Sequence, residues 1–331
     1  MFSKKKKVGV ISIEHSQNIG NNLLKYSMSI LLYKLGYDPY IVGMRFKNHN
    51  ISFIQKVTQL RLIKESFSEI KKNDYDILMV NSDQTWRKWS NDYKYFYDIA
   101  FLKFAENWDI PKFVYGASLG RNIWEYTKDD EEIAKSLLKD FNSISVREKG
   151  AVQLIEEHLG IKPHFVLDPT LLIDKKYYLN IIKNYKGDFQ SENYIFIYTV
   201  LNLEQVSSFV RQINKNYNYK IHWVKDGIED FILGIYYSKA VITDSYHGTL
   251  FSIIFNKPFI TFIYEYSGKE RFNSLKEVFN IGNRFFDIDS FPDITLLENP
   301  LYLNMTSFNL LKKESTIKFS LIYTMLFIIR N

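Results

Sequence analysis

The chain contains no cysteine among its 331 residues. This absence excludes disulfide bonds, thiolate zinc sites, iron–sulfur clusters and a catalytic cysteine. The sequence also lacks a P-loop lysine motif, a GxGxxG fingerprint and an EF-hand loop, so P-loop chemistry, NAD and calcium have no support. His158, His164 and His222 show no metal-ligand spacing with one another. We expect neither a metal site nor a bound cofactor.

Long hydrophobic runs are also missing. The C-terminal segment 321–329 is apolar but falls well short of the roughly 20 residues that a membrane-spanning helix needs. We expect it to be a helix packed on the body of the protein. A basic run at residues 4–7 precedes an apolar segment that is too short for the core of a signal peptide. These features predict a cytoplasmic protein, with peripheral contact at the inner face of the membrane left open.

The composition that is present is that of a soluble globular protein. Hydrophobic residues make up 46%, aromatic residues 17% and charged residues 24% of the chain. The formal net charge is +6, which suits polyanions, anionic substrates or a membrane surface without choosing among them. No stripe of basic residues or nucleic-acid-binding module is visible, so we expect no nucleic-acid partner.

Two separate segments open with an apolar strand, a helix and a second strand. The first runs from Lys7 to Gly43 and the second from Tyr194 to Val224. Buried parallel strands need helices on both faces of the sheet. The pattern predicts an α/β protein with two Rossmann-like domains facing a cleft. We place the boundary at Asp168-Pro169, with domains 1–168 and 169–331 and the C-terminal helix in the second domain.

Ligands of such sheets bind beyond the carboxyl ends of the strands, so the residues that follow each strand are informative. In the segment 240–258, an apolar strand leads through a polar turn to His247-Gly248-Thr249 at the start of a helix. Free backbone N–H groups at a helix N-terminus attract anions such as phosphate. His247 is suited to general acid–base chemistry. The alternative is that His247 only caps the helix while Asp244 or Ser245 satisfies backbone amides.

Five motifs occur in the order and spacing of the polysaccharide pyruvyl transferase family, which the chain resembles over roughly residues 8 to 270. They are Asn18-Ile19-Gly20, Ser82-Asp83-Gln84-Thr85-Trp86, Ser145-Val146-Arg147-Glu148, Val166-Leu167-Asp168-Pro169-Thr170 and Thr243-Asp244-Ser245-Tyr246-His247-Gly248. The resemblance implies a fold similar to GT-B glycosyltransferases. It also implies transfer of a pyruvyl ketal group from phosphoenolpyruvate, as co-substrate, to a sugar of a surface polysaccharide such as capsule, or to its lipid-linked precursor.

The chemistry that the resemblance implies assigns roles to these residues. His247 would protonate the methylene carbon of phosphoenolpyruvate, and Asp83 would orient or deprotonate a sugar hydroxyl. Binding of the anionic donor is assigned to Arg147, Ser245, Gly248, Thr249 and Lys257. The acceptor or the cleft wall is assigned to Asn18, Gly20, Gln84, Trp86, Asp168 and Asp244.

Structural alternatives stand beside several of these roles. Arg147 could form an ion pair with Glu148 or an aspartate, and Asp83 could be a turn residue. Lys257 could be an exposed residue at a helix end, and Trp86 could be buried under a loop instead of stacking on a sugar. Arg271 follows another apolar strand and is a further candidate for the cleft.

The motif departs from the family pattern at one position. Family members that use phosphoenolpyruvate often carry an arginine two residues before the motif histidine, and this chain has Ser245 there. Two other functions therefore remain open. One is a GT-B-type glycosyltransferase that uses a nucleotide-sugar donor, and the other is a non-catalytic protein that binds a glycan.

Overall fold

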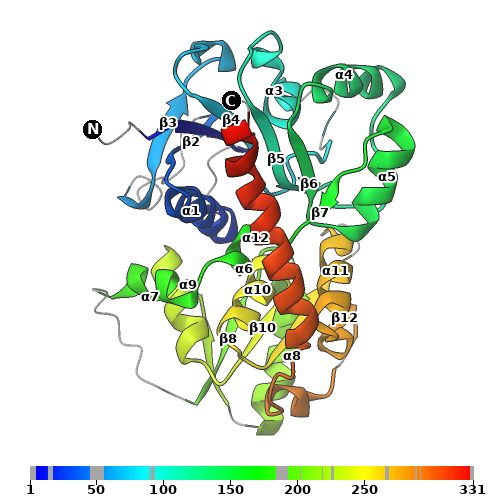
Figure 1. The fold of residues 1–331 in the computed structure, drawn as a ribbon. Helices are drawn as coiled ribbons and strands as arrows, with labels where there is room; N and C mark the ends of the chain where they lie inside the picture. Colours follow the sequence, from blue (N-terminus) through cyan, green and yellow to red (C-terminus); the bar gives the residue numbers. More distant parts are fainter. Residues whose placement is uncertain are drawn as a thin grey trace. The chain divides into compact units, whose positions relative to one another are not determined.

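The computed structural model describes residues 5–13, 18–44, 56–88, 90, 94–183, 193–201, 203–217, 219–224, 227–264, 268–287, 289–290 and 292–328. The chain divides into two compact units (Figure 1). Unit 1 comprises Met1–Ile173 and Asn309–Asn331, and unit 2 comprises Asp174–Phe308. Each unit is a parallel sheet covered by helices, which confirms the predicted α/β class with two Rossmann-like domains.

Unit 1 is built on a seven-stranded parallel sheet with strand order β3-β2-β1-β4-β5-β6-β7. Its strands are β1 (Lys7–Ile11), β2 (Asp38–Met44), β3 (Gln59–Ile63), β4 (Ile77–Val80), β5 (Lys112–Ala117), β6 (Ser143–Val146) and β7 (His164–Phe165). The strand order reverses between β1 and β4, and a ligand crevice is expected at the carboxyl ends of such a pair.

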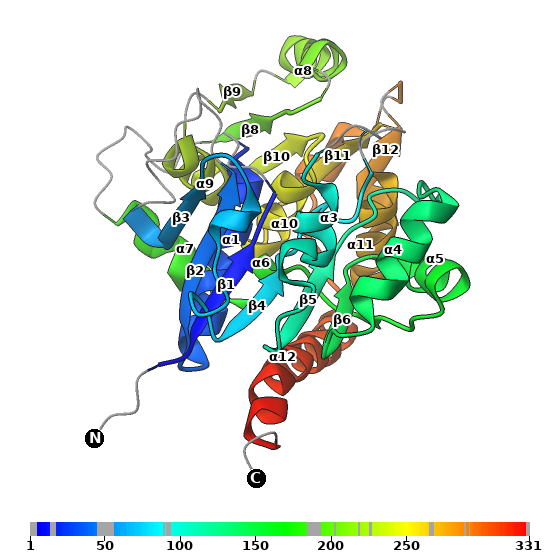
Figure 2. The same cartoon turned by 90° about the horizontal axis from the view of Figure 1, so that it is seen from above.

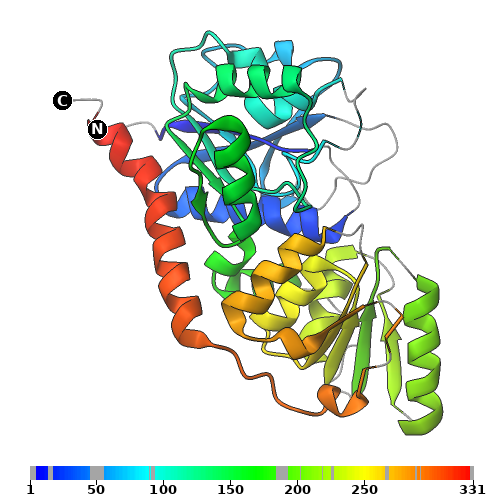
Figure 3. The same cartoon turned by 90° about the vertical axis from the view of Figure 1, so that its right-hand side faces the viewer.

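Helices cover both faces of this sheet (Figure 3). α1 and α6 pack against each other, and α1 also contacts β2, whereas α4 and α5 pack on the opposite face. The helices of unit 1 are α1 (Ile19–Lys34), η1 (Phe67–Glu69), α3 (Phe96–Phe101), η2 (Lys103–Ala105), α4 (Lys128–Leu138), α5 (Lys149–Leu159), α6 (Pro169–Leu172) and most of α12 (Met305–Ile328).

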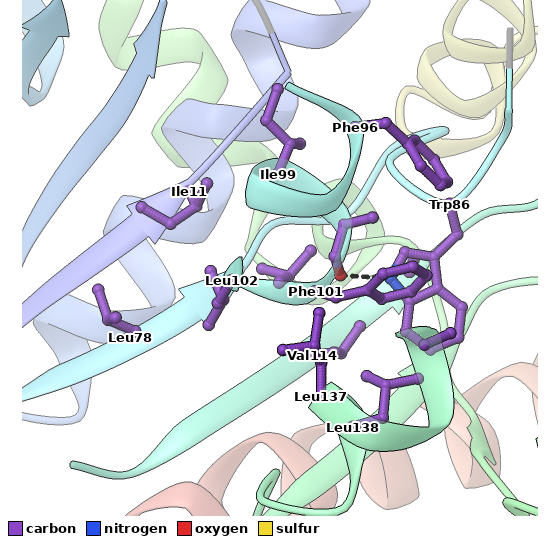
Figure 4. Close-up of a cluster of buried hydrophobic side chains, with 14 of the residues drawn as sticks. Ile11, Leu78, Trp86, Phe96, Ile99, Phe101, Leu102, Val114, Leu137 and Leu138 are labelled. Carbon is purple, nitrogen blue, oxygen red and sulfur yellow. Dashed lines mark hydrogen bonds between the residues drawn. The ribbon is translucent and has the colours of Figure 1, made fainter. Parts of the chain in front are cut away.

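The core under α4 and α5 is rich in aromatic side chains (Figure 4). Trp86 lies at its centre, where its ring meets the edge of Phe101 at a centroid distance of 5.6 Å. The indole Nε1 donates a hydrogen bond to the Ala100 carbonyl oxygen at 2.9 Å. Leu137 and Leu138 of α4 close the cluster over Val114 of β5. This apolar packing fixes the loop after β4, which carries part of the candidate site.

The C-terminal helix α12 packs mainly on unit 1, not on unit 2 as the predicted domain limits had it. The Ser315 hydroxyl accepts a hydrogen bond from the Leu167 backbone N–H, and Phe319 packs edge-on against Tyr115. The predicted boundary at Asp168 also falls too early, because α6 packs on α1 and belongs to unit 1. Among the described residues, no helix is both long and apolar enough to cross a membrane.

Unit 2 is built on a five-stranded parallel sheet with strand order β12-β11-β10-β8-β9. Its strands are β8 (Tyr194–Tyr198), β9 (Lys220–Trp223), β10 (Ala240–Thr243), β11 (Phe259–Ile263) and β12 (Phe285–Asp287). The strand order reverses between β8 and β10. The motif that contains His247 directly follows β10, so it lies at this reversal.

The two faces of the unit 2 sheet carry different helices (Figure 2). α8 and η5 cover one face, and α9 and α10 cover the other, where Phe231 and Phe251 meet edge-to-face. The helices of unit 2 are α7 (Lys175–Ile182), α8 (Leu203–Tyr217), α9 (Gly227–Tyr237), α10 (Tyr246–Ile254), α11 (Lys269–Phe279), η4 (Gly282–Arg284) and η5 (Ile294–Leu297).

Candidate functional site

The candidate site in unit 1 lies at the carboxyl ends of β1, β4, β5 and β6. Asp83 follows β4, Arg147 follows β6, and α1 begins after β1. The backbone of Asp83 takes a positive φ of 104°, which is rare for a residue with a side chain and costs on the order of 1–3 kcal/mol. Its carbonyl oxygen accepts a hydrogen bond from the Ser118 N–H at 2.8 Å, which ties the loop to the end of β5. Strain of this kind is concentrated at functional sites.

Arg147, Gln84 and Asn21 donate hydrogen bonds to the Asp83 carboxylate. Oδ1 accepts hydrogen bonds from Arg147 Nη2 at 3.0 Å and from the Gln84 backbone N–H at 2.8 Å. Oδ2 accepts one from Asn21 Nδ2 of α1 at 2.5 Å. The side chain keeps 11% of its surface exposed, while its main partner Arg147 has none. Asp83 is therefore a fixed carboxylate that still reaches the surface.

Arg147 lies between carboxylates and is completely buried. Besides Asp83, it donates from Nη1 to Asp168 Oδ2 at 2.5 Å, and Glu148 Oε1 lies 3.9 Å from its Nε. This arrangement corresponds to the ion pair that the sequence left open for Arg147. A guanidinium that two aspartates already neutralise is poorly placed to bind an anionic donor as well.

Asp168 is a structural residue instead of part of a cleft wall. Its side chain has no exposed surface. Its Oδ1 accepts hydrogen bonds from the backbone N–H and the hydroxyl of Thr170, which caps α6. The sequence motif around Asp168 therefore forms the connection between β7 and α6.

The remaining residues assigned to the acceptor in unit 1 divide into two groups. Asn18 is exposed and caps α1, since its Oδ1 accepts from the Asn21 N–H at 3.0 Å, and Gln84 is half-buried beside Asp83. Gly20 is buried in the first turn of α1. Trp86 has no exposed surface, so the prediction that it contacts a sugar is wrong. Its indole fills the core under α4 (Figure 4).

Lys25 is a site residue that the sequence reasoning missed. It lies in α1 four residues after Asn21 and has no exposed surface. Burial lowers the pKa of Lys25 to about 7, although attraction to Asp83 opposes this change. A signal existed, because Asn21 and Lys25 are polar residues four positions apart in the same helix.

The burial of Lys25 predicts a pH-dependent stability. Between about pH 7 and pH 10 the unfolded chain keeps a Lys25 proton that the folded protein has released, so stability rises with pH. We expect wild type to gain about 1.4 kcal/mol per pH unit relative to Lys25→Met across this range. Urea unfolding at several pH values measures the difference. The exposed Lys34 of the same helix supplies the control Lys34→Met, which should follow wild type. Parallel curves for wild type and Lys25→Met would contradict the prediction.

The candidate site in unit 2 is the turn from β10 into α10. Ser245 caps α10, since its Oγ accepts a hydrogen bond from the Gly248 N–H at 3.3 Å. The Thr243 hydroxyl donates to the Tyr198 carbonyl oxygen and accepts from the Ser245 N–H. A Cβ on Gly248 would lie 2.3 Å from Thr243 Oγ1, so this position has no room for a side chain. The turn is thus held rigidly against the sheet.

Two polar residues of this turn have structural roles and do not line an exposed site. The Asp244 carboxylate accepts hydrogen bonds from the N–H groups of Val200 and Leu201, at 2.7 and 3.0 Å. Burial and the nearby Asp244 charge raise the pKa of the Tyr198 hydroxyl. Thr249 has no exposed surface, and its hydroxyl bonds to Ser245 and Thr261. Both side chains, which the sequence assigned to ligand contacts, are buried and hydrogen-bonded within unit 2.

His247 lies in the first turn of α10, and both it and the buried Arg271 contact Tyr246. Its ring meets Tyr246 edge-to-face at 5.5 Å. Arg271 contacts the same tyrosine, since its guanidinium lies 4.9 Å from the centre of the Tyr246 ring. Arg271 comes from the first turn of α11, directly after β11, and is 8% exposed. A histidine, a guanidinium and a helix N-terminus therefore gather at one edge of the unit 2 sheet. Glu265, which follows the same apolar segment in the sequence and is a candidate for the cleft on the same ground, lies outside the described residues.

Lys257 is far from this group. It follows the C-terminus of α10, and its ammonium donates to the Ser238 carbonyl oxygen at 2.8 Å, ahead of β10. Because α10 runs antiparallel to the strands, Lys257 lies at the amino edge of the sheet, whereas His247 lies at the carboxyl edge. Lys257, which the sequence assigned to donor binding, and His247 therefore lie at opposite edges of the unit 2 sheet, whereas Arg271 and His247 both contact Tyr246.

A cavity of about 290 Å³ opens at the carboxyl ends of β8 and β9. Its lining consists of Thr199, Val200, Leu201, Trp223 and Val224. The sequence reasoning did not identify this cavity. Among the described residues, no three acidic or histidine side chains lie close enough together to hold a metal ion.

Comparisons with known proteins agree with this architecture. A sequence model described as polysaccharide pyruvyl transferase matches residues 18–266. No curated protein matches the sequence. A UDP-GlcNAc 2-epimerase from Neisseria meningitidis, solved bound to UDP-GlcNAc, is similar with a TM-score of 0.58 and 10% identity, covering 94% of both chains. The 2-epimerase from Methanocaldococcus jannaschii has a TM-score of 0.53 and 12% identity, covering 96% of this chain and 99% of that one.

A plant enzyme shares the same architecture. Arabidopsis thaliana UGT89C1, solved in complex with UDP, has a TM-score of 0.54 and 10% identity, covering 94% of both chains. These likenesses show a fold of the GT-B type. At such low identity they concern the fold alone.

Proposed function

Because the chain belongs to the polysaccharide pyruvyl transferase family, we propose that it transfers a pyruvyl group from phosphoenolpyruvate to a sugar. The acceptor is a surface polysaccharide or its lipid-linked precursor. The observation that carries this proposal is the family match over residues 18–266, which includes the carboxyl-edge motifs of both units. The proposal assigns the donor to unit 2 and the acceptor to unit 1.

The carboxyl edge of the unit 2 sheet carries groups that would favour binding of an anionic donor. Phosphoenolpyruvate carries a phosphate and a carboxylate, and both are favoured by a guanidinium and by the N-terminus of α10. Arg271 provides the cation, and Ser245 and Gly248 shape the turn. His247, in the same helical turn as Gly248, provides a proton donor near neutral pH. These features favour Arg271 over Arg147 and Lys257 as the donor-binding cation.

The unit 1 edge supplies a carboxylate for the acceptor. Asp83 is partly exposed and is fixed by Arg147, Asn21 and the Gln84 backbone. A carboxylate held in this way can accept a hydrogen bond from a sugar hydroxyl and align it for attack. Gln84 adds a half-buried amide beside it.

The reaction can be balanced with these groups. A sugar hydroxyl adds to the enol carbon and gives its proton to Asp83, while His247 delivers a proton to the methylene carbon, which becomes a methyl group. Phosphate then leaves with the electron pair of its bond to that carbon. The second hydroxyl attacks the resulting oxocarbenium carbon, and its proton is taken up by the departing phosphate. Preorganised donors such as Arg271 stabilise the charge on the phosphate.

The test is ligand binding measured by thermal shift. We expect phosphoenolpyruvate to stabilise wild type, by about 2.7 kcal/mol at 100 times its dissociation constant. Arg271→Met should abolish the shift. Arg211→Met, which removes an exposed arginine of α8 in the same unit, should preserve it.

UDP-sugars and CMP-sugars are titrated beside phosphoenolpyruvate. A shift with a nucleotide-sugar and none with phosphoenolpyruvate would contradict the proposal. It would favour a glycosyltransferase, the function that Ser245 leaves open. A shift with an oligosaccharide but with neither donor would favour a glycan-binding protein.

A further inference from the structure

A second cavity, of about 430 Å³, opens in unit 1 at the amino edge of its sheet. Its walls come from the second half of α1 and from the starts of β2 and β3. Asn21 of α1 contacts Asp83 at the carboxyl edge, and Tyr33 of the cavity lies twelve residues further along the helix, about 18 Å away. The volume is within the usual range for small-molecule sites. The cavity is therefore separate from the residues assigned to the reaction.

A carboxylate lines this cavity. Asp38 Oδ2 accepts a hydrogen bond from the Tyr40 hydroxyl at 3.2 Å, and Oδ1 accepts one from Gln59 Nε2 at 2.5 Å. A carboxylate has about four acceptor sites, so each oxygen can accept a further hydrogen bond. No lysine or arginine in the described part of the chain forms an ion pair with Asp38. The cavity thus offers a carboxylate that can accept hydrogen bonds from a ligand.

A hydroxyl group lies in the wall formed by α1. Ser29 and Tyr33 are four residues apart on one face of this helix, and both line the cavity. The Ser29 Oγ atom is buried, and it has no hydrogen-bond partner among the described residues. Most buried polar side-chain atoms in proteins are paired. A ligand that carries hydroxyl groups can supply the missing partner.

The remaining lining is largely aliphatic and aromatic. Ile30, Pro39 and Val57 contribute aliphatic surface. The Tyr33 side chain is 62% exposed, and the Lys5 ammonium lies 4.2 Å from the centre of its ring. The cavity therefore combines a few hydrogen-bonding groups with apolar walls, as ligand sites do.

We propose that this cavity binds a neutral sugar unit of a glycan chain. A sugar ring carries hydroxyl groups at its rim, which suit Asp38 and Ser29, and C–H groups on its faces, which suit Tyr33. A phosphate or carboxylate ligand would face the Asp38 charge, and an ammonium ligand would face the ammonium groups of Lys5 and Lys56. A hydrocarbon chain would cover Asp38 and Ser29 without offering them a partner.

The source of the sugar rests on the proposed function, in which the acceptor is a glycan. A unit held at the amino edge anchors the chain, while another unit of the same chain reaches Asp83 at the carboxyl edge. Anchoring of this kind raises the effective concentration of the reacting unit without a new contact at the reaction site. The cavity thus favours acceptors of several sugar units over single sugars.

The direct test follows the δ1-methyl group of Ile30 by NMR in protein labelled at its isoleucine methyl groups. The signal is assigned by its loss in Ile30→Val. Galactose, glucose, N-acetylglucosamine and lactose are titrated without phosphoenolpyruvate. We expect at least one of these sugars to move the Ile30 signal to saturation, and AMP and methylammonium to leave it in place. No movement with any of the four sugars, or tighter binding of AMP or methylammonium, would overturn the inference.

Variants of the lining show whether the sugar occupies the cavity. Asp38→Asn should weaken the binding seen at Ile30 by about tenfold or more, because it removes hydrogen bonds to a charged group. Asp76→Asn is the control, since Asp76 lies at the same edge outside the cavity lining and should preserve binding. Tyr33→Ala should also weaken binding, and the exposure of this ring makes a loss of folding unexpected. Unchanged affinity in both Asp38→Asn and Tyr33→Ala would overturn the inference.

Kinetics separate this site from the proposed reaction. Asp38→Asn should raise KM for an oligosaccharide acceptor about tenfold and leave kcat unchanged, because Asp38 takes no part in the chemical step. A lower kcat with unchanged KM would overturn the anchoring role. If a sugar moves the Ile30 signal while phosphoenolpyruvate gives no transfer, the proposed function fails and the sugar site stands. If transfer occurs and no sugar moves the signal, the sugar site alone fails.

Discussion

His247→Ala is expected to reduce pyruvyl transfer by about 10²–10⁴-fold, the range that a positioned general acid contributes. The imidazole lies in the first turn of α10, directly after β10, where the proposal places the donor. Transfer is measured from phosphate release with an acceptor present. Phosphoenolpyruvate binding should survive in the variant, because Arg271 and the helix N-terminus remain.

His222→Ala is the matched control for this experiment. His222 lies on β9 of the same unit and stacks on Phe196, away from the end of β10. We expect it to retain most of the transfer activity. Equal activity of His247→Ala and wild type would remove His247 from the mechanism and leave the motif with a structural role.

Arg147→Met is expected to lower the free energy of unfolding by about 3–5 kcal/mol, because it leaves the Asp83 and Asp168 carboxylates buried without their cation. Urea unfolding measures this loss. Arg121→Met is the control, since Arg121 pairs with Glu125 at the surface of the same unit and should contribute about 1 kcal/mol or less.

The same pair of variants separates two roles for Arg147. If Arg147→Met folds as stably as Arg121→Met and fails to bind phosphoenolpyruvate, Arg147 is a donor ligand after all. If it is strongly destabilised and keeps donor binding under stabilising conditions, Arg147 is the structural anchor of Asp83. The geometry favours the second outcome, because its side chain has no exposed surface.

The fold could be predicted from the sequence because fully buried strands appear in it as continuous apolar runs. The two predicted segments begin at Lys7 and Tyr194, and the observed strands β1 and β8 begin at the same residues. β3 (Gln59–Ile63) and β12 (Phe285–Asp287) were missed. The first is an edge strand with polar residues and the second is very short, so neither leaves an apolar signature.

The candidate site was predicted less completely, because position after a strand does not determine where a side chain points. Asp83 and Trp86 lie in one motif, yet Asp83 reaches the surface and Trp86 is buried in the core. Lys257 belongs to the same sequence segment, 240–258, as His247, but most of α10 separates them. Lys25 was missed although it lies four positions after Asn21 in the same helix. Side-chain direction in turns depends on tertiary contacts that one sequence does not reveal.

The order in which the chain is made differs from the order in which its two units can be completed. Unit 2 is continuous from Asp174 to Phe308, whereas unit 1 needs the residues of α12 that follow it. During synthesis, unit 2 can therefore finish folding before Ser315 and Phe319 are made. These two residues form the contacts with the Leu167 N–H and the Tyr115 ring in unit 1. A chain that ends before Asn309 would therefore contain all residues of unit 2 but lack part of unit 1.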